Sequence, residues 1–112
     1  MSRRQQAALA AIPLESSVAL FATLANSMRL RLLVALSRFG PMSAGDLQGI
    51  AGGEQSAVSH QLAILRRRRL VAARRDGRQM IYRLLDDHVA HIVESALEHE
   101  DEPRRASRAR RN

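Results

Sequence analysis

The dipeptide Asp76-Gly77 predicts a tight β-hairpin, because glycine tolerates the positive φ that a two-residue turn requires. The runs on either side of it, residues 70–75 and 78–84, include strand-favouring residues such as Val71 and Tyr82. The chain upstream has the apolar spacing of helices instead. The expected fold class is therefore mainly α with a β-hairpin.

Two helices are predicted in the first forty residues. Ser16 or Ser17 can cap the first, which continues to about Leu24. Its apolar side would consist of Val18, Phe21, Ala22 and Leu24. The second helix covers residues 28–39, is apolar enough to be largely buried, and is closed by Gly40-Pro41. It is the expected core helix, and two of the three aromatic residues, Phe21 and Phe39, are expected in the core.

A short helix, a glycine turn and a longer helix come next. Ser43 with Asp46 three residues later is a variant of the capping box, and it opens a helix that Gly52-Gly53 ends. The longer helix covers residues 54–67, and its inward positions are Val58, Leu62 and Leu65. Followed by a basic hairpin, this order describes a winged helix-turn-helix, whose second helix enters the major groove of DNA.

The outward side chains of the longer helix suit the recognition of base edges. Gln55 can pair with adenine, and Ser56 and Ser59 can bond to several kinds of base edge. His60 can reach a guanine acceptor or, equally well, only a phosphate. These four residues are the predicted DNA-reading set.

The hairpin concentrates positive charge. Residues 66–83 contain eight arginines and a single acid, Asp76. Arg75 and Arg78 flank the predicted turn and can reach phosphate or the minor groove. The hairpin is therefore a candidate DNA wing, with an ordinary solvated hairpin as the alternative.

Composition points to the same partner. All 18 basic residues are arginine, the net charge is +7 and the pI is about 11.6, so double-stranded DNA is the first partner to consider. The chain has no cysteine, which excludes disulfides, thiolate metal sites and thiol redox switches. No apolar run approaches the roughly 18 residues of a membrane span, and residues 1–11 do not have the composition of a signal peptide. We expect a cytoplasmic protein without a membrane partner.

The segment 86–102 has the opposite charge, with seven acids and no arginine. It reads as one helix that carries four potential metal ligands, Asp86, His88, His99 and Glu102. His88 and His99 share one face, but they lie about 16 Å apart along the helix axis. A zinc–nitrogen bond is only about 2 Å long, so one chain cannot bring both histidines to one ion.

An antiparallel partner helix removes this difficulty. Asp86 and His88 of one protomer would then meet His99 and Glu102 of the other, which gives a homodimer with two symmetric sites. The same helix carries an apolar stripe suited to packing on a partner, made of Val89, Ile92, Val93, Ala96 and Leu97. The alternative is an acidic solvated face without metal.

These residues resemble the ArsR/SmtB family of metal-sensing bacterial repressors over about residues 15–103. Residues 55–62 are similar to the family's recognition helix and residues 77–84 to its wing. The set of four ligands resembles the carboxy-terminal helix site of the zinc-sensing branch. The resemblance implies a homodimer whose metal-free form binds a palindromic operator and blocks transcription, and which Zn(II) releases.

The residue types limit the choice of metal. Family members that sense through thiolates carry cysteine near the start of the helix that begins here at Ser43, so arsenite, cadmium and lead are disfavoured. Nitrogen and oxygen ligands favour Zn(II), which Co(II) can mimic, and His91 could serve Ni(II) as an additional ligand. A winged-helix repressor that senses Ni(II), Co(II) or a non-metal signal, with the acidic helix only a dimer interface, is the alternative.

The expected organisation has three segments. Residues 1–14 form a flexible N-terminal arm, and residues 15–103 form the winged helix-turn-helix domain with its dimerising C-terminal helix. Pro103 is expected to stop that helix, and residues 104–112 form a basic disordered tail that can add phosphate contacts.

Two other classes of function fit less well. An RNA-binding protein would need a platform of aromatic side chains, and two of the three aromatics are expected in the core. An enzyme is disfavoured because no nucleophile and base are paired in the sequence and no phosphate loop is present.

Overall fold

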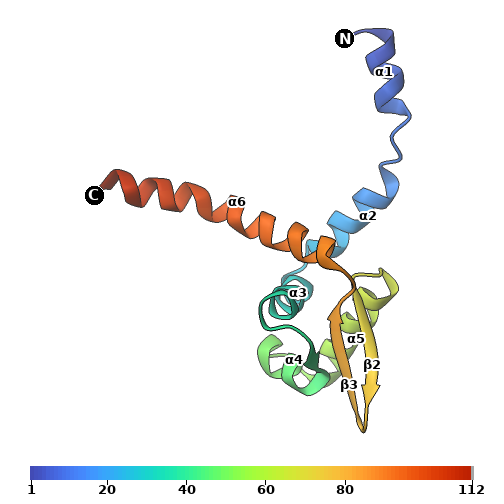
Figure 1. Ribbon diagram of the computed structural model, residues 1–112, viewed down its shortest axis with the longest axis vertical. Coiled ribbons are helices and arrows are strands. Elements are labelled where there is room, and N and C mark those ends of the chain that lie inside the picture. The colour runs from blue at the N-terminus through green and yellow to red at the C-terminus, as the bar shows by residue number, and fades with distance from the viewer. Residues whose placement is uncertain (112) are drawn as a thin grey trace.

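The computed structural model describes the backbone of residues 1–111 and the side chains of residues 1–101. It has the predicted winged helix-turn-helix, with helices α3 to α5 and the β-hairpin gathered under the start of a long C-terminal helix (Figure 1). The elements are α1 (Arg3–Ala10), α2 (Glu15–Leu24), α3 (Ser27–Phe39), β1 (Met42–Ser43), α4 (Ala44–Ala51), α5 (Gln55–Arg67), β2 (Val71–Asp76), β3 (Gln79–Leu84) and α6 (Asp87–Arg111).

The core forms around α3, as predicted. Its members come from α3, α4, α5, the hairpin and the first turns of α6, and they include Leu32, Leu33, Leu36, Leu47, Leu62, Leu65, Val71, Val89 and Val93. Burying each leucine contributes about 1.5–3 kcal/mol relative to leaving it in water. The three inward positions of α5 are all buried, which fixes the direction of its opposite face.

In the central region, α3 is capped by Asn26, and α4 has the predicted Ser43 at its start and Gly52 at its end. Asn26 Oδ1 accepts a hydrogen bond from the backbone N–H of Arg29 at 3.0 Å, and Ser43 Oγ accepts one from Asp46 at 3.1 Å. Gly52 ends α4 in the left-handed conformation, with φ of 73°. These caps set the short turn between α4 and α5.

The sheet has the strand order β1-β3-β2, and both pairings are antiparallel. Asp76 pairs with Gln79, so the turn residues are Gly77 and Arg78 and the turn lies one residue later than predicted. Gly77 has φ of 63°, the positive value that the first position of a type II′ turn requires. β1 was not predicted, because a strand of two residues has no periodicity of its own.

The prediction for α2 was partly wrong. The helix begins at Glu15, its N-cap is Leu14, and no side chain caps it, so Ser16 and Ser17 lie inside the helix. Val18 and Phe21 are 64% and 65% exposed. The helix instead turns Leu20, Thr23 and Leu24 toward α3, and the buried Thr23 hydroxyl is satisfied by the carbonyl of Ala19 at 2.8 Å. Phe39, also expected in the core, is 70% exposed at the end of α3.

Both ends of the chain differ from the expected irregular segments. The expected arm contains α1, which begins with a capping box between Ser2 and Gln5 and has no buried residue. Pro103 does not stop α6, which continues to Arg111. A proline removes one backbone hydrogen bond from a helix, but it does not always end the helix. The side chains of Glu102 and of the basic tail lie outside the described residues.

No single helix in the described part of the chain is long and apolar enough to cross a membrane. Only α1 and α2 taken together reach such a length and composition, across a bend of 59°.

Candidate nucleic-acid interface and metal centre

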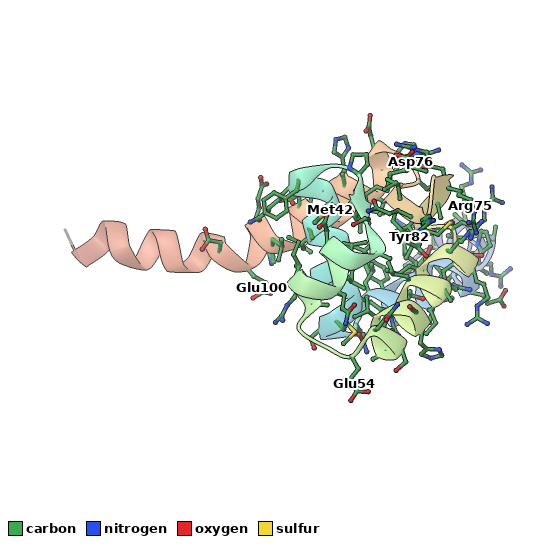
Figure 2. All side chains as sticks on the ribbon, turned by 90° about the horizontal axis from the view of Figure 1, so that it is seen from below. Met42, Glu54, Arg75, Asp76, Tyr82 and Glu100 are labelled. Carbon is green, nitrogen blue, oxygen red and sulfur yellow. The ribbon has the colours of Figure 1, made fainter. Side chains whose placement is uncertain are left out.

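The outward face of α5 carries the predicted DNA-reading residues. Gln55, Ser56, Ser59 and His60 are all exposed, and Val58 and Leu62 anchor the opposite face in the core. Side chains at these positions lie on the first two turns of the helix, the part that a helix-turn-helix presents to base edges. Figure 2 views the molecule from the side of the wing tip, where Glu54 projects outward just before α5.

The turn before α5 approaches α3 closely. A Cβ atom at Gly53 would lie 2.9 Å from the terminal methyl of Met28, which is closer than real Cβ contacts. Glycine at this position therefore lets the start of the recognition helix rest directly on the start of α3.

The wing presents its arginines on two faces. Alternation along β2 puts Arg75 on the same face as buried Val71, and Arg74 on the opposite, outer face. Arg78 was predicted to flank the turn, but it is the second residue of the turn. Arg74 lies 4.0 Å from Asp76, and this exposed ion pair contributes little to stability. The positive charge at the wing tip is thus available to a polyanion.

Asp86 and His88 lie together at the start of α6. His88 Nδ1 is 3.6 Å from Asp86 Oδ1, and the His88 side chain is 89% exposed. Two ligands on one tetrahedral zinc ion with bonds of about 2 Å lie about 3.3 Å apart, so the pair has nearly the required separation. Asp86 also accepts a hydrogen bond from Val89 N–H at 3.3 Å, which holds its carboxylate at the helix start.

His99 lies near the far end of the described part of α6 and is exposed, as is His91. Among the described side chains, no group of three or more His, Cys, Asp or Glu residues is arranged to hold a metal ion. Glu102, the fourth predicted ligand, lies outside the described side chains. The described side chains of one protomer therefore form no complete site.

The apolar stripe on α6 is shared between the chain's own core and its surface. Val89 and Val93 are buried against the core, whereas the stripe was expected to serve a partner. Ile92 is half-buried and Ala96 is exposed. Because the chain's own core covers Val89 and Val93, only the less buried side of the stripe, at Ile92 and Ala96, remains for a second protein.

An ion pair fixes α6 to α3. Arg38 donates to both carboxylate oxygens of Glu94, at 3.2 and 3.4 Å. These hydrogen bonds lower the pKa of the Glu94 carboxyl from its ordinary value, against a smaller opposing effect of burial. In Figure 2 the labelled Glu100 of α6 and Arg75 of the wing lie on opposite sides of the domain.

Two arginines with structural importance were not identified from the sequence. Arg69 adopts φ of 61°, a left-handed conformation that non-glycine residues rarely occupy. Arg29 is half-buried and hydrogen-bonds to Thr23 and Gln61. The charge pattern contains no signal that separates either of them from the surface arginines.

The fold, the exposed face of α5 and the basic wing together define a winged helix-turn-helix DNA-binding protein. Residues 26–73 match the family model described as "Bacterial regulatory protein, arsR family". The chain is 46% identical over 78 residues to the HTH-type transcriptional regulator NmtR of Mycobacterium tuberculosis. The matched region covers 70% of this chain and 64% of that protein.

Solved structures agree. The chain is 40% identical to the AntR antimony-specific transcriptional repressor, with a TM-score of 0.72 over 80% of each chain. It is 27% identical to the homodimeric winged helix-turn-helix DNA-binding domain Mb0332 of Mycobacterium bovis, with a TM-score of 0.73 over 91% of this chain and 89% of that one.

The chain belongs to the arsR family of bacterial regulatory proteins. Because the family consists of transcriptional regulators, the prediction that the chain is not an enzyme is confirmed. The chain spans about 60% of the length of the curated relatives named NmtR, SmtB homolog and biofilm growth-associated repressor.

Proposed function

We propose that the chain is a metal-responsive transcriptional repressor. Its metal-free homodimer binds a palindromic operator, and Zn(II) binding between the two C-terminal helices releases the DNA. The observation that carries the proposal is the exposed Asp86 and His88 pair, with donor atoms 3.6 Å apart, on a helix that also carries His99 about three turns away. The antimony specificity stated for AntR supports the idea of an inorganic signal.

The donor types favour zinc. Asp86 and His88 of one protomer would be completed by His99 and Glu102 of the partner subunit, and carboxylate and imidazole ligands suit Zn(II). Co(II) is compatible with the same ligands, and Ni(II) would gain from His91, which is exposed one turn after His88. With no cysteine in the chain, a thiolate site of the kind that soft ions prefer is excluded.

Exposed apolar side chains support the homodimer. Leu14, Val18 and Phe21 lie on one side of α2 and are 59–65% exposed. Three large apolar residues at helical spacing are costly to leave in water, so a second copy covering them would stabilise the protein. The homodimeric state of Mb0332, which has the same fold, agrees with this.

DNA binding would use both basic and polar groups. Gln55, Ser56, Ser59 and His60 would read base edges, and Arg75 and Arg78 would contact phosphate or the minor groove. If zinc favours a dimer in which the two α5 helices no longer match successive major grooves, DNA must weaken zinc binding by the same factor. Such couplings are typically about 1–3 kcal/mol. A cytoplasmic location is expected for a protein with this role.

The test is a Zn(II) titration of the metal-free dimer bound to operator-length DNA from its own promoter, followed by fluorescence anisotropy at fixed salt. We expect release at about one zinc per protomer. His99→Ala should keep DNA binding and lose the zinc response, and His91→Ala, on the same helix, is the matched control that should respond normally. Release of the His99→Ala variant by zinc would refute the assigned site.

If Co(II) or Ni(II) releases the DNA and Zn(II) does not, the proposed metal is wrong but the proposed ligands stand. Tight DNA binding that is indifferent to all three metals would instead favour the alternative, in which the acidic helix is only a dimer interface and the signal is not a metal.

A further inference from the structure

Arg29 is a half-buried arginine at the start of α3 that bonds to two other helices. Its Nε–H donates to the carbonyl of Thr23 at 2.7 Å, and its Nη1 donates to Oε1 of Gln61 at 3.0 Å. Thr23 lies in the last turn of α2, and Gln61 lies in the middle of α5. One side chain thus joins the end of α2 to the recognition helix.

The chemistry of arginine fits both contacts. Carbonyls in the last turn of a helix have no partner within the helix, and a cation at that end is favoured by the helix dipole. The planar guanidinium offers its donors in fixed directions, so one bond aligns the other. The position of Arg29 is itself set by Asn26, whose side chain accepts its backbone N–H at 3.0 Å.

Gln61 is well placed to transmit this contact. It is half-buried and follows directly on Ser59 and His60, whose side chains are exposed, while the next residue, Leu62, is 1% exposed. The residue before Arg29, Met28, supports the turn at Gly53 that begins α5. The start of α3 therefore approaches the turn before α5 at Gly53 and bonds to α5 itself at Gln61.

We propose that Arg29 is a positioning residue for operator binding. Through its bonds to Thr23 and Gln61, Arg29 fixes the position of α5 relative to α2. The orientation of the DNA-reading face therefore depends on a hydrogen bond that does not itself contact DNA. The inference rests on the proposed function, because it assumes that α5 binds operator DNA. It gives Arg29 a role distinct from that of the surface arginines, which would act on phosphates by charge.

The test is a double-mutant cycle with Arg29→Met, Gln61→Leu and the double variant, measured as operator affinity over a series of salt concentrations. We expect each single change to weaken binding about tenfold, and the double variant to be no weaker than either single variant. The slope of log affinity against log salt should stay as in the wild type, whereas loss of a phosphate contact lowers it by about 0.9.

Arg31→Met is the matched control, because Arg31 is exposed on the same helix and its removal changes the net charge by the same amount. It should leave operator affinity within about twofold of the wild type, as is usual for surface substitutions. Additive losses in the cycle, or a reduced salt slope for Arg29→Met, would overturn the inference.

Gln61→Leu keeps the test valid if Arg29→Met does not fold, because Gln61 is not in the core. In the absence of DNA, the amide hydrogens of α5 should exchange faster in the Gln61→Leu variant than in the wild type. If the wild type binds no operator, the proposed function fails and this exchange measurement alone decides on Arg29. Unchanged exchange in α5 would then refute the positioning role.

Discussion

Replacement of Arg69 by glycine is expected to stabilise the protein. Arg69 follows Arg68, the C-cap of α5, and has φ of 61°. The backbone N–H of Leu70 bonds to the carbonyl of Leu65 at 2.9 Å, and that of Arg69 to Arg66 at 3.0 Å. This is the Schellman arrangement, in which the left-handed position usually belongs to glycine. Leu65 and Leu70 are buried, so the conformation is held by the core.

The magnitude follows from two opposing effects. A non-glycine residue pays about 1–2 kcal/mol in the left-handed conformation. Glycine gives the unfolded chain more freedom, which costs about 0.4–1 kcal/mol. Because Arg69 is exposed, little packing is lost. The net gain in free energy of unfolding should be about 0.5–1 kcal/mol, which corresponds to a rise of about 2–4 °C in Tm for a chain of this size.

The assay is urea unfolding at one fixed protein concentration, because dimerisation makes the midpoint depend on concentration. The midpoint should rise for Arg69→Gly, and Arg69→Ala, which keeps the left-handed strain, should give no gain. The matched control is Arg68→Gly, one residue earlier with φ of −82°, which should lower stability by about 0.5–1 kcal/mol. Equal midpoints for Arg68→Gly and Arg69→Gly, or no gain for Arg69→Gly, would refute the reasoning.

Two further predictions concern the DNA-reading face and α6. Ser59→Ala or His60→Ala should weaken operator binding, by about 1–3 kcal/mol where a base contact is lost, while zinc affinity stays as in the wild type; unchanged operator affinity would remove that residue from the reading surface. The Arg38–Glu94 pair should stabilise the protein by less than about 1 kcal/mol, since it is exposed. Because the pKa of Glu94 is lowered by folding, this contribution is present above the ordinary carboxyl range and is lost as pH falls through the lowered pKa. Glu94→Gln should therefore cost stability at pH 7 and cost less at acid pH, and a pH-independent difference in urea midpoint would contradict the assignment.

Much of the architecture could be predicted from local pattern. The inward spacing of Val58 and Leu62, the cap at Ser43 and the glycine of the hairpin turn each act within a few residues, so they are visible in the sequence. The exposure of Gln55, Ser56, Ser59 and His60 followed from the same spacing, because burying one face of a helix exposes the other. The ligand pattern on α6 also predicted a metal site shared between two chains, because His88 and His99 are about three turns apart, and the described side chains of one chain form no complete site.

The errors have a common cause. α2 has apolar residues on more than one side, and only its contact with α3 decides that Leu20 and Leu24 are covered while Phe21 is not. The turn was predicted one residue too early, because Asp76 can serve either as a turn residue or as the last residue of a strand. Pairing with β3 decides between the two.

The sequence by itself determined the order of helices α2 to α6 and of the hairpin, the caps at Ser43 and Gly52, the inward and outward faces of α5 and the charge of each segment, because these depend on neighbours within a turn or two. Only the tertiary structure decided which apolar faces remain uncovered, that Arg69 must adopt a left-handed backbone, and that Arg29 joins α2 to α5 through Gln61. The last of these contacts joins residues 32 positions apart in the chain. No local pattern encodes it, since it exists only when packing of the core brings the three helices together.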